Sequence, residues 1–401
     1  MSTTTSPLPA ETCQSGPARP WFAVAAAGVS TFSVVTTEML PVGLLTRIAA
    51  DLQASAGTTG LAMSIPALMA ALFAPVAVVA AGARDRRRVL IGLLALLAAA
   101  NLASALAPGI AWLLAVRILV GLCMGGIWAI AGGLAARLVP PARIGTATAV
   151  IFGGVAAASV LGVPLGALVG DLLGWRSAFA AMALVCLVVL AANWRALPAL
   201  PMTGSIRLAD IAGQLRVSRL RLGLAVTLLI VAGHFMAFTF VRPMLQSVSH
   251  LAAIWVGPLL FAYGLAGIAG NFLAGTLAQR EAGPPLATIV VALAGSLLLV
   301  IGAGASPAGG ALALILWGGA YGGVSVSLQT WIMRAAPGMV EAGTALFVAA
   351  FNLGIAAGSA AGGLVVDGHG LTANLILAAG VTIMALVPAL LIRPSATPPG
   401  P

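Results

Sequence analysis

The chain has 401 residues, of which 61% are hydrophobic and 7% are charged, and its mean hydropathy is +1.11. Soluble globular proteins carry about a quarter charged residues, so this composition excludes that class and indicates a membrane protein. The net charge of +10 rests on arginine alone, and the absence of lysine excludes a phosphate-binding Walker lysine and a Schiff base.

Twelve apolar runs near twenty residues long follow one another along the chain. Because about twenty apolar residues suffice for one helix to cross a bilayer, each run predicts a transmembrane helix. In chain order the predicted helices cover 22–46, 57–80, 89–107, 111–136, 145–172, 177–194, 222–246, 254–277, 286–304, 310–333, 342–366 and 371–392.

The predicted helices form two sets of six, separated by the only sizeable polar segment between the tails. We expect a disordered cytoplasmic tail over 1–20 with no signal peptide, because this segment is polar and has no apolar core before a cleavage site. The expected fold is an all-α polytopic membrane protein with twelve transmembrane helices in two pseudo-symmetric six-helix bundles. The remaining expected parts are an N-terminal bundle over 21–194, a cytoplasmic linker over 195–221, a C-terminal bundle over 222–392 and a cytoplasmic tail over 393–401.

A ladder of three glycines at four-residue spacing occurs in both halves, and an aspartate lies near the end of each copy. The two copies are Gly162, Gly166 and Gly170 with Asp171, and Gly354, Gly358 and Gly362 with Asp367. One ladder alone would indicate only that two membrane helices pack closely. Two copies at equivalent places indicate a duplicated chain, which suits a transporter whose like halves rock around a central site.

The distribution of arginine predicts the orientation of the chain. With the N-terminus in the cytoplasm, fifteen of the nineteen arginines lie in inner segments, two in outer segments and two within predicted helices. The positive-inside rule therefore places both termini in the cytoplasm of a multi-pass plasma-membrane protein, in the inner membrane for a bacterium. The charge is a topology signal, so we expect the lipid bilayer and not nucleic acid as a partner.

Charged residues inside the membrane are the best guide to function, because they are costly unless paired or hydrated. Glu38 is the only acidic residue well inside a predicted helix, and Arg117 enters the 111–136 helix from the outer side. At 1.5 Å per residue both lie about 10 Å below the outer surface, so they could meet. An acid that alternates between a proton and a substrate near a fixed cation is one interpretation; a static ion pair between two helices is the other.

Other polar and aromatic residues are candidates to contact a substrate. His234, near the middle of the 222–246 helix, would relay protons or donate to a substrate, unless it only makes an interior hydrogen bond. Arg242 would contact a ligand or extend to the interface, and Asn271 and Gln329 would bind a substrate or join helices. Most aromatic residues at helical spacing only pack, so a minority of these are expected to stack a flat ligand: Trp128, Phe235, Phe238, Phe240, Tyr263, Trp317 and Tyr321.

Catalytic chemistry has no visible motif. The three cysteines and three histidines are scattered, so neither a metal site nor a disulfide framework is predicted. No nucleophile lies in a recognisable setting. We therefore expect no cofactor, no metal and no enzyme activity, and an ion gradient as the driving force if the protein pumps.

Four short segments resemble motifs of the major facilitator superfamily. After the second predicted helix, Asp85-Arg86-Arg87-Arg88 looks like a shortened form of its loop signature, with Ala81 where a glycine is expected. Gly275-Thr276-Leu277-Ala278-Gln279-Arg280 is a cleaner copy, with Gln279 in place of the aspartate. Arg117 with Gly121 resembles the fourth-helix motif, and Gly162-Val163-Pro164-Leu165-Gly166 resembles the fifth-helix motif associated with antiporters.

The resemblance implies roles for individual residues. In the drug–proton antiporter branch the first-helix acid and the fourth-helix arginine are implicated in proton coupling, which implies this role for Glu38 and Arg117. The loop residues would bridge helix ends and stabilise one access state, so a gating role is expected for Asp85, Arg86, Arg88 and Arg280. Pro164 and the glycines of the two ladders are expected to pack helices.

Within that branch the first half looks like bacterial purine ribonucleoside efflux pumps. The segments that carry this resemblance include Glu38-Met39-Leu40-Pro41-Val42-Gly43, Gly125-Gly126-Ile127-Trp128-Ala129 and Gly174-Trp175-Arg176. In the second half Phe240-Val241-Arg242-Pro243 also fits, whereas Gly233-His234-Phe235 and Leu328-Gln329-Thr330-Trp331 look more like the sugar-efflux and chloramphenicol-efflux relatives.

Together these features predict a monomeric secondary transporter that exports a small organic solute in exchange for protons by alternating access. The expected solute is a purine nucleoside or a similar compound, or a drug, and in the latter case the protein would confer drug resistance. Three alternatives stay open: a sugar or amphenicol efflux pump, a proton-coupled importer, and a non-transporting membrane sensor.

Overall fold

The computed structural model describes residues 20–81, 84–200, 213–278, 283–335 and 340–391, and this part of the chain contains helices and no strand. Residues 1–19 of the predicted N-terminal tail, the predicted C-terminal tail, residues 201–212 of the predicted linker and Arg280 lie outside it. The first half contains α1 (Pro20–Asp51), α2 (Ala56–Ala81), α3 (Arg86–Ala105), α4 (Ile110–Leu138), α5 (Ile144–Ala157), α6 (Val163–Leu173) and α7 (Trp175–Ala196). A 3-10 turn, Pro141–Arg143, precedes α5, and a π-helical turn, Ala158–Gly162, joins α5 to α6.

The second half repeats this plan. It contains α9 (Ser218–Phe238), α10 (Val241–Ser247), α11 (Val256–Ala278), α12 (Gly283–Gly302), α13 (Pro307–Ala335), α14 (Val340–Met384) and α15 (Leu386–Leu391), with a 3-10 turn, Ala253–Trp255, before α11. The predicted helix over 222–246 is therefore α9 followed by the short α10.

Ten helices within the described residues are long and apolar enough to cross a bilayer, and Leu286–Gly302 is a shorter apolar helix. One of the ten joins two predicted helices, because α14 runs on across Gly370. Gly370 has a φ of 85° and a ψ of 175°, a conformation that glycine adopts without a steric penalty, and it separates the predicted helices 342–366 and 371–392. With that helix counted twice and the shorter one added, the predicted twelve-helix fold is confirmed.

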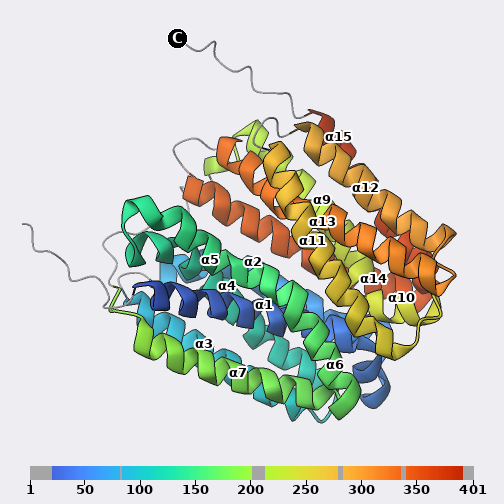
Figure 1. Ribbon diagram of the computed structural model, residues 1–401, viewed down its shortest axis with the longest axis horizontal. Coiled ribbons are helices and arrows are strands. Elements are labelled where there is room, and N and C mark those ends of the chain that lie inside the picture. The colour runs from blue at the N-terminus through green and yellow to red at the C-terminus, as the bar shows by residue number, and fades with distance from the viewer. Residues whose placement is uncertain (1–19, 82–83, 201–212, 279–282, 336–339, 392–401) are drawn as a thin grey trace, which may run out of the picture.

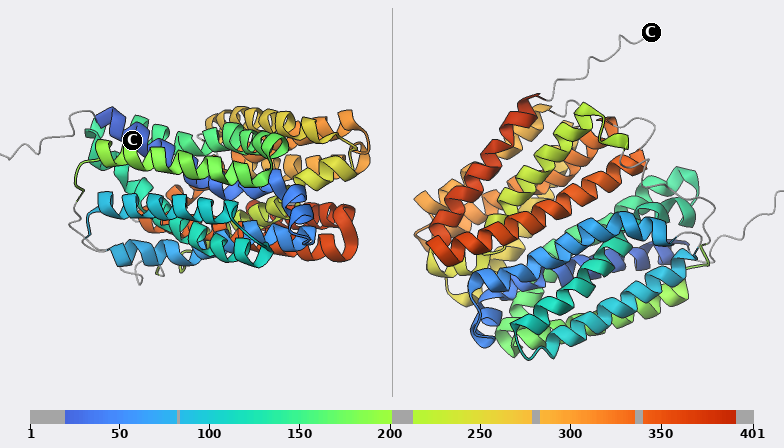
Figure 2. Two further views of the ribbon diagram at one scale, coloured as in Figure 1. Left: turned by 90° about the horizontal axis from the view of Figure 1, so that it is seen from below. Right: turned by 180° about the vertical axis from the view of Figure 1, so that it is seen from behind.

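The two halves lie side by side, as the blue-to-green and yellow-to-red parts of Figure 1 show and the right view of Figure 2 repeats. Between the halves α2 packs on α14, α11 packs on α6 and the π-helical turn, and α1 contacts α10. We call the end at which α1 and α6 finish and α2 and α7 begin the outer end, following the predicted orientation. The other end is the inner end.

The glycine ladders pack the same pair of helices in each half. A Cβ atom at Gly162, Gly166 or Gly170 would lie 2.2, 2.2 or 2.1 Å from the side chains of α1. A Cβ atom at Gly358 would lie 2.2 Å from the backbone of Ala232 in α9. Each ladder therefore lets its helix approach the first helix of its own half, and larger residues would push the two apart.

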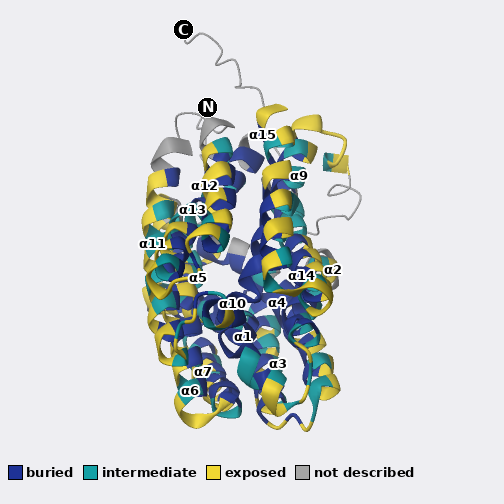
Figure 3. Ribbon diagram, turned by 90° about the vertical axis from the view of Figure 1, so that its right-hand side faces the viewer, coloured by how far each residue is buried: buried dark blue, intermediate teal, exposed yellow. Residues whose placement is uncertain are grey.

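Apolar side chains cover much of the outside of the bundle. Exposed residues, yellow in Figure 3, lie on the outward faces of the helices and buried residues lie between them. Leu172, Phe272 and Leu364 are 73%, 71% and 78% exposed. In water such a surface would aggregate, whereas lipid chains solvate it, so the exposed leucines and phenylalanines fit a bilayer.

Candidate functional site

Arg117 is fully buried where α4 passes α1 and α2. Its Nε donates to the carbonyl oxygen of Ala62 (2.8 Å), Nη1 to that of Thr37 (3.0 Å) and Nη2 to that of Glu38 (2.7 Å). Two of these carbonyl groups lack a helical partner, because Pro41 and Pro66 have no N–H to donate to the residues four positions before them. The guanidinium group supplies the missing donors and holds α1 and α2 together.

Glu38 meets Arg117 through its backbone, and no ion pair involves its carboxylate among the described residues. The static ion pair considered from the sequence is therefore not formed in this structure. The expected depth also changes: α1 runs on to Asp51, which lies about 20 Å from Glu38 along the helix.

The Glu38 side chain faces the contact between the halves. It is 3% exposed and its Oε1 atom has no hydrogen-bond partner. The carboxyl group lies within electrostatic range of Arg117 in its own half and of Tyr321 in the other. A buried carboxylate without a partner is costly, so Glu38 needs a proton, a cation or a ligand donor when water does not reach it.

His234 joins α9 to α13. The indole Nε1 of Trp317 donates to His234 Nδ1 (2.9 Å), and both side chains are buried. Because an indole N–H can only donate, Nδ1 accepts and the neutral imidazole carries its proton on Nε2. This is the interior hydrogen bond that one interpretation of the sequence expected, and a second proton on Nδ1 would break it. The proton relay stays a prediction.

The rings around His234 form one cluster, which we call the aromatic cluster. Tyr321 stacks on His234 with 3.4 Å between ring centroids and 9° between planes, and Phe238 stacks at 4.9 Å and 20°. Phe235 contacts His234 edge-on, and Tyr263 of α11 stacks on Phe238. The Tyr321 hydroxyl is buried and has no hydrogen-bond partner. With Trp317, which contacts His234 edge-on, the cluster brings six of the predicted site residues together.

The remaining predicted substrate contacts lie elsewhere. Trp128 of α4 packs on Phe152 of α5, with 5.7 Å between ring centroids. Gln329 is half-buried on α13 and Asn271 is exposed on α11. Among the described residues Trp128 makes no ring contact with the aromatic cluster. Gln329 and Asn271 each lie eight residues, about 12 Å along the helix, from the cluster residue of their own helix, which is Tyr321 or Tyr263.

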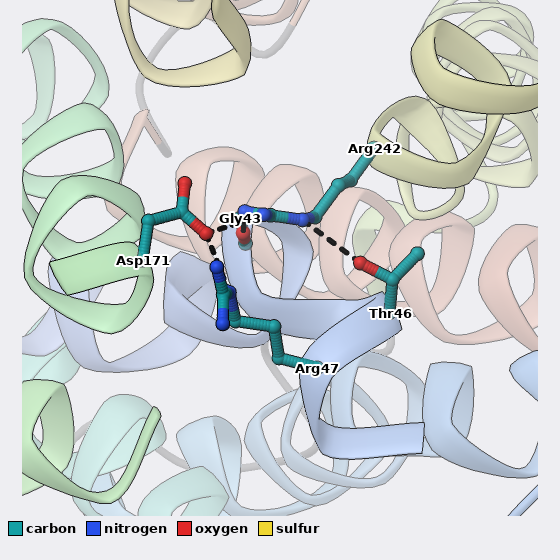
Figure 4. Close-up of polar contacts among 5 residues, drawn as sticks. All are labelled: Gly43, Thr46, Arg47, Asp171 and Arg242. Carbon is teal, nitrogen blue, oxygen red and sulfur yellow. Dashed lines mark hydrogen bonds and ion pairs between the residues drawn. The ribbon is translucent and has the colours of Figure 1, made fainter. Parts of the chain in front are cut away.

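Arg242 does not extend to the membrane–water interface, which one interpretation of the sequence expected. It is 1% exposed, and its three nitrogens bind the other half of the molecule (Figure 4). Nη2 pairs with Asp171 Oδ1 (2.5 Å), Nη1 donates to the Gly43 carbonyl (2.5 Å) and Nε donates to Thr46 Oγ1 (2.9 Å). Substrate contact, the other interpretation, would require these bonds to break.

Asp171 also binds Arg47 of its own half, which the sequence did not predict. Arg47 Nε lies 2.6 Å from the same Oδ1 atom, so one carboxylate oxygen serves two guanidinium groups (Figure 4). The aspartate after each glycine ladder was visible in the sequence, but nothing in its spacing pointed to Arg242.

At the inner end Asp85 caps α3. Its Oδ1 accepts from Arg87 N and from Leu200 N, each at 2.9 Å, and Arg86 N donates to the Leu200 carbonyl (3.1 Å). Arg88 is exposed. These contacts join the α2–α3 loop to the segment after α7 within one half. The gating role expected for these loop residues stays a prediction, since Arg280 lies outside the described residues.

Comparison with known proteins gives the same architecture. The Major Facilitator Superfamily sequence profile matches residues 27–347. The transcription regulatory protein OpdE of Pseudomonas aeruginosa is 35% identical over 386 residues, which cover 95% of this chain and 96% of that protein. The purine ribonucleoside efflux pump NepI of Salmonella paratyphi A is 33% identical over 380 residues, covering 94% and 96%.

Two solved structures share the fold. A bacterial homologue of the human lysosomal transporter Spinster, in an inward-facing and occupied conformation, has a TM-score of 0.74 at 15% identity and covers 93% of this chain and 96% of that one. The human organic anion transporter MFSD10 has a TM-score of 0.66 at 20% identity, covering 92% and 99%. At these identities the likeness shows the fold alone.

Proposed function

The chain belongs to the major facilitator superfamily, and from that premise we propose that it exports a small organic solute across the inner membrane in exchange for protons. It is a multi-pass membrane transporter of small molecules, and its efflux-pump relatives support export. In the proposal it works as a monomer with both termini in the cytoplasm. The solute site lies between the halves and opens to one side at a time.

The observation that carries this proposal is the unpaired carboxyl group of Glu38 between the halves. A protonated carboxyl group is a weaker acceptor for a ligand N–H than a carboxylate, so proton and solute compete for Glu38. A proton that arrives from outside displaces the solute and favours the return to the inward-facing state. Arg117 keeps α1 and α2 in register through the carbonyl oxygens of Thr37, Glu38 and Ala62, and its charge lowers the cost of ionising Glu38.

The aromatic cluster supports a flat, neutral heterocycle as the solute, such as a purine nucleoside. Tyr321 and Glu38 come from opposite halves, and each has a buried polar atom without a partner. A ring with a donor beside an acceptor on one edge would bind both, the carboxylate accepting and the phenol donating. Phe235, Phe238 and Tyr263 would stack the ring, and Trp128, Asn271 and Gln329 are further candidate contacts in the open cavity.

The proposal is tested in everted membrane vesicles that hold a pH gradient. Inosine should collapse the gradient, as followed with a fluorescent dye, because each molecule moved returns protons. Glu38→Gln should abolish the response while the protein remains folded and inserted. Asp51→Asn is the matched control, because Asp51 is an exposed acid paired with Arg176 in its own half. Full coupling in Glu38→Gln would remove Glu38 from the mechanism.

A different solute would leave the scheme intact. If inosine has no effect in folded protein, the nucleoside assignment is discarded and amphenicols and sugars are tested in the same vesicles. Proton-coupled import is recognised by solute flux in the opposite direction.

A membrane sensor is the second candidate function, because a relative at 35% identity is named a transcription regulatory protein. The Glu38→Gln variant distinguishes the transporter from the sensor. If the transport-deficient variant still changes the same transcripts as the wild type, the protein acts as a sensor. If the transcript changes disappear with the flux, any regulation follows from transport.

A further inference from the structure

The two aspartates that end the glycine ladders bind the opposite half at the outer end of the molecule. Asp171 of the first half pairs with Arg242 of α10 at 2.5 Å. Asp367 of the second half accepts from Ser55 Oγ (2.5 Å) and from Gly57 N (2.8 Å), where α2 begins. Both contacts lie at one end, because Arg242 binds the last turns of α1 and the residues around Ser55 follow α1 directly.

We propose that these two contacts form a paired outer gate, in which the duplicated aspartates hold the halves together and both release when the cavity opens outward. The gate is a property of the closed outer end and does not depend on which solute is carried. Its two members correspond to each other in the repeated sequence, so the gate has the same pseudo-symmetry as the fold.

The two contacts differ in their surroundings. Arg242 is buried and the Asp171 side chain is 13% exposed, so their charges attract each other with little screening by water. Asp367 is exposed, and its partners are a hydroxyl and an amide. The Asp171 contact is therefore the stronger member, and the Asp367 contact adds to it on the other side of the interface.

Arg47 makes the Asp171 contact reversible. It binds the same Oδ1 atom from the half to which Asp171 belongs. When α10 moves away, Asp171 keeps Arg47 and is not left as an unpaired carboxylate. Arg242 loses its partners as water enters the opening, and that water solvates the freed guanidinium group. Separation of the halves thus leaves neither charge buried alone.

The gate is tested by measuring a distance across the outer end in lipid nanodiscs. Spin labels are placed at Leu106→Cys in the first half and Ile254→Cys in the second, both 70–71% exposed, after the three native cysteines are replaced by alanine. Asp171→Asn should raise the long-distance population by about tenfold, as expected for losing one charge-assisted hydrogen bond. Asp367→Asn should raise it less, and the double variant most.

Asp51→Asn is the control, because it removes an outer-end acid whose ion pair lies within one half. It should leave the distances unchanged. An unchanged distribution in the folded double variant overturns the proposal, and so does an equal shift in Asp51→Asn. A response of Asp171→Asn alone overturns the pairing. The measurement needs no solute, so failure of the proposed transport function would not alter its result.

Discussion

Among the residues of the aromatic cluster, Tyr321 has a buried hydroxyl oxygen without a hydrogen-bond partner. A buried hydroxyl normally has such a partner. The ring itself is fixed by stacking on His234, which Trp317 holds in one tautomer. A fixed ring with an unpartnered polar atom close to Glu38 is suited to bind a ligand, whereas Phe235 and Phe238 can only pack or stack.

Tyr321→Phe should therefore weaken solute binding with little change in stability. The variant removes a hydroxyl that makes no bond within the protein, and the loss of one bond to the solute should raise the half-maximal solute concentration by about tenfold. The measurement is solute-dependent proton flux in vesicles. Tyr263→Phe is the natural comparison, because these are the chain's two tyrosines and Tyr263 is proposed to act through its ring. Equal losses in both variants would contradict a special role for the Tyr321 hydroxyl.

The sequence singled out Glu38, Arg117 and Arg242 as intramembrane charges, but it did not predict the contacts that they make. The sequence predicted that Glu38 and Arg117 could meet, and they do so through the Glu38 backbone, although Glu38 lies deeper than the apolar run had indicated. Arg117 binds carbonyl groups and not the carboxylate, because Pro41 and Pro66 leave the carbonyl groups of Thr37 and Ala62 without helical donors. The sequence shows the two prolines, but only the structure shows that Arg117 lies beside these carbonyl groups. Arg242 binds Asp171 in the other half of the molecule, and no periodicity in the sequence relates two residues so far apart.

Among the elements, α1 and α2 depend on Arg117 for bonds that their prolines remove. Arg117→Lys keeps the charge but loses the planar fork that reaches three carbonyl oxygens. We expect the free energy of unfolding to fall by about 2–4 kcal/mol, since one or two charge-assisted bonds are lost. Thermal unfolding in detergent measures this. Arg47→Lys is the control, because Arg47 is 41% exposed and should cost less than about 1 kcal/mol. Equal melting temperatures for Arg117→Lys and the wild type would contradict a structural role for the three carbonyl contacts.

The repeated elements were the most predictable part of the fold. The glycine ladders predicted close helix contacts, since small residues at four-residue spacing form a flat face. The π-helical turn at Ala158–Gly162 and the break in α9–α10 were not predicted, because both depend on how the neighbouring helices pack. Helix ends also shifted: α1 continues beyond the apolar run to Asp51, whose carboxylate pairs with Arg176.

At the scale of the whole molecule, the closed outer end rests on close backbone contact as well as on charge. A Cβ atom at Gly57 would lie 2.3 Å from the carbonyl oxygen of Gly363. Glycine at position 57 therefore allows α2 and α14 to touch at the point where Asp367 binds. The balance between inward-facing and outward-facing states should respond to a single methyl group here, without any change in charge.

Gly57→Ala should shift that balance toward the outward-facing state. Ser64 lies two turns further along α2 and is buried, so a cysteine there is reached from outside only when the halves separate. In a chain without its native cysteines, a membrane-impermeant maleimide should label Ser64→Cys about tenfold faster when Gly57→Ala is present, because the closed state is strained by the added methyl group. Gly92→Ala is the control, since nothing lies within 4 Å of a Cβ atom at that position. Equal labelling rates in intact cells would mean that the contact between α2 and α14 does not set the conformational equilibrium.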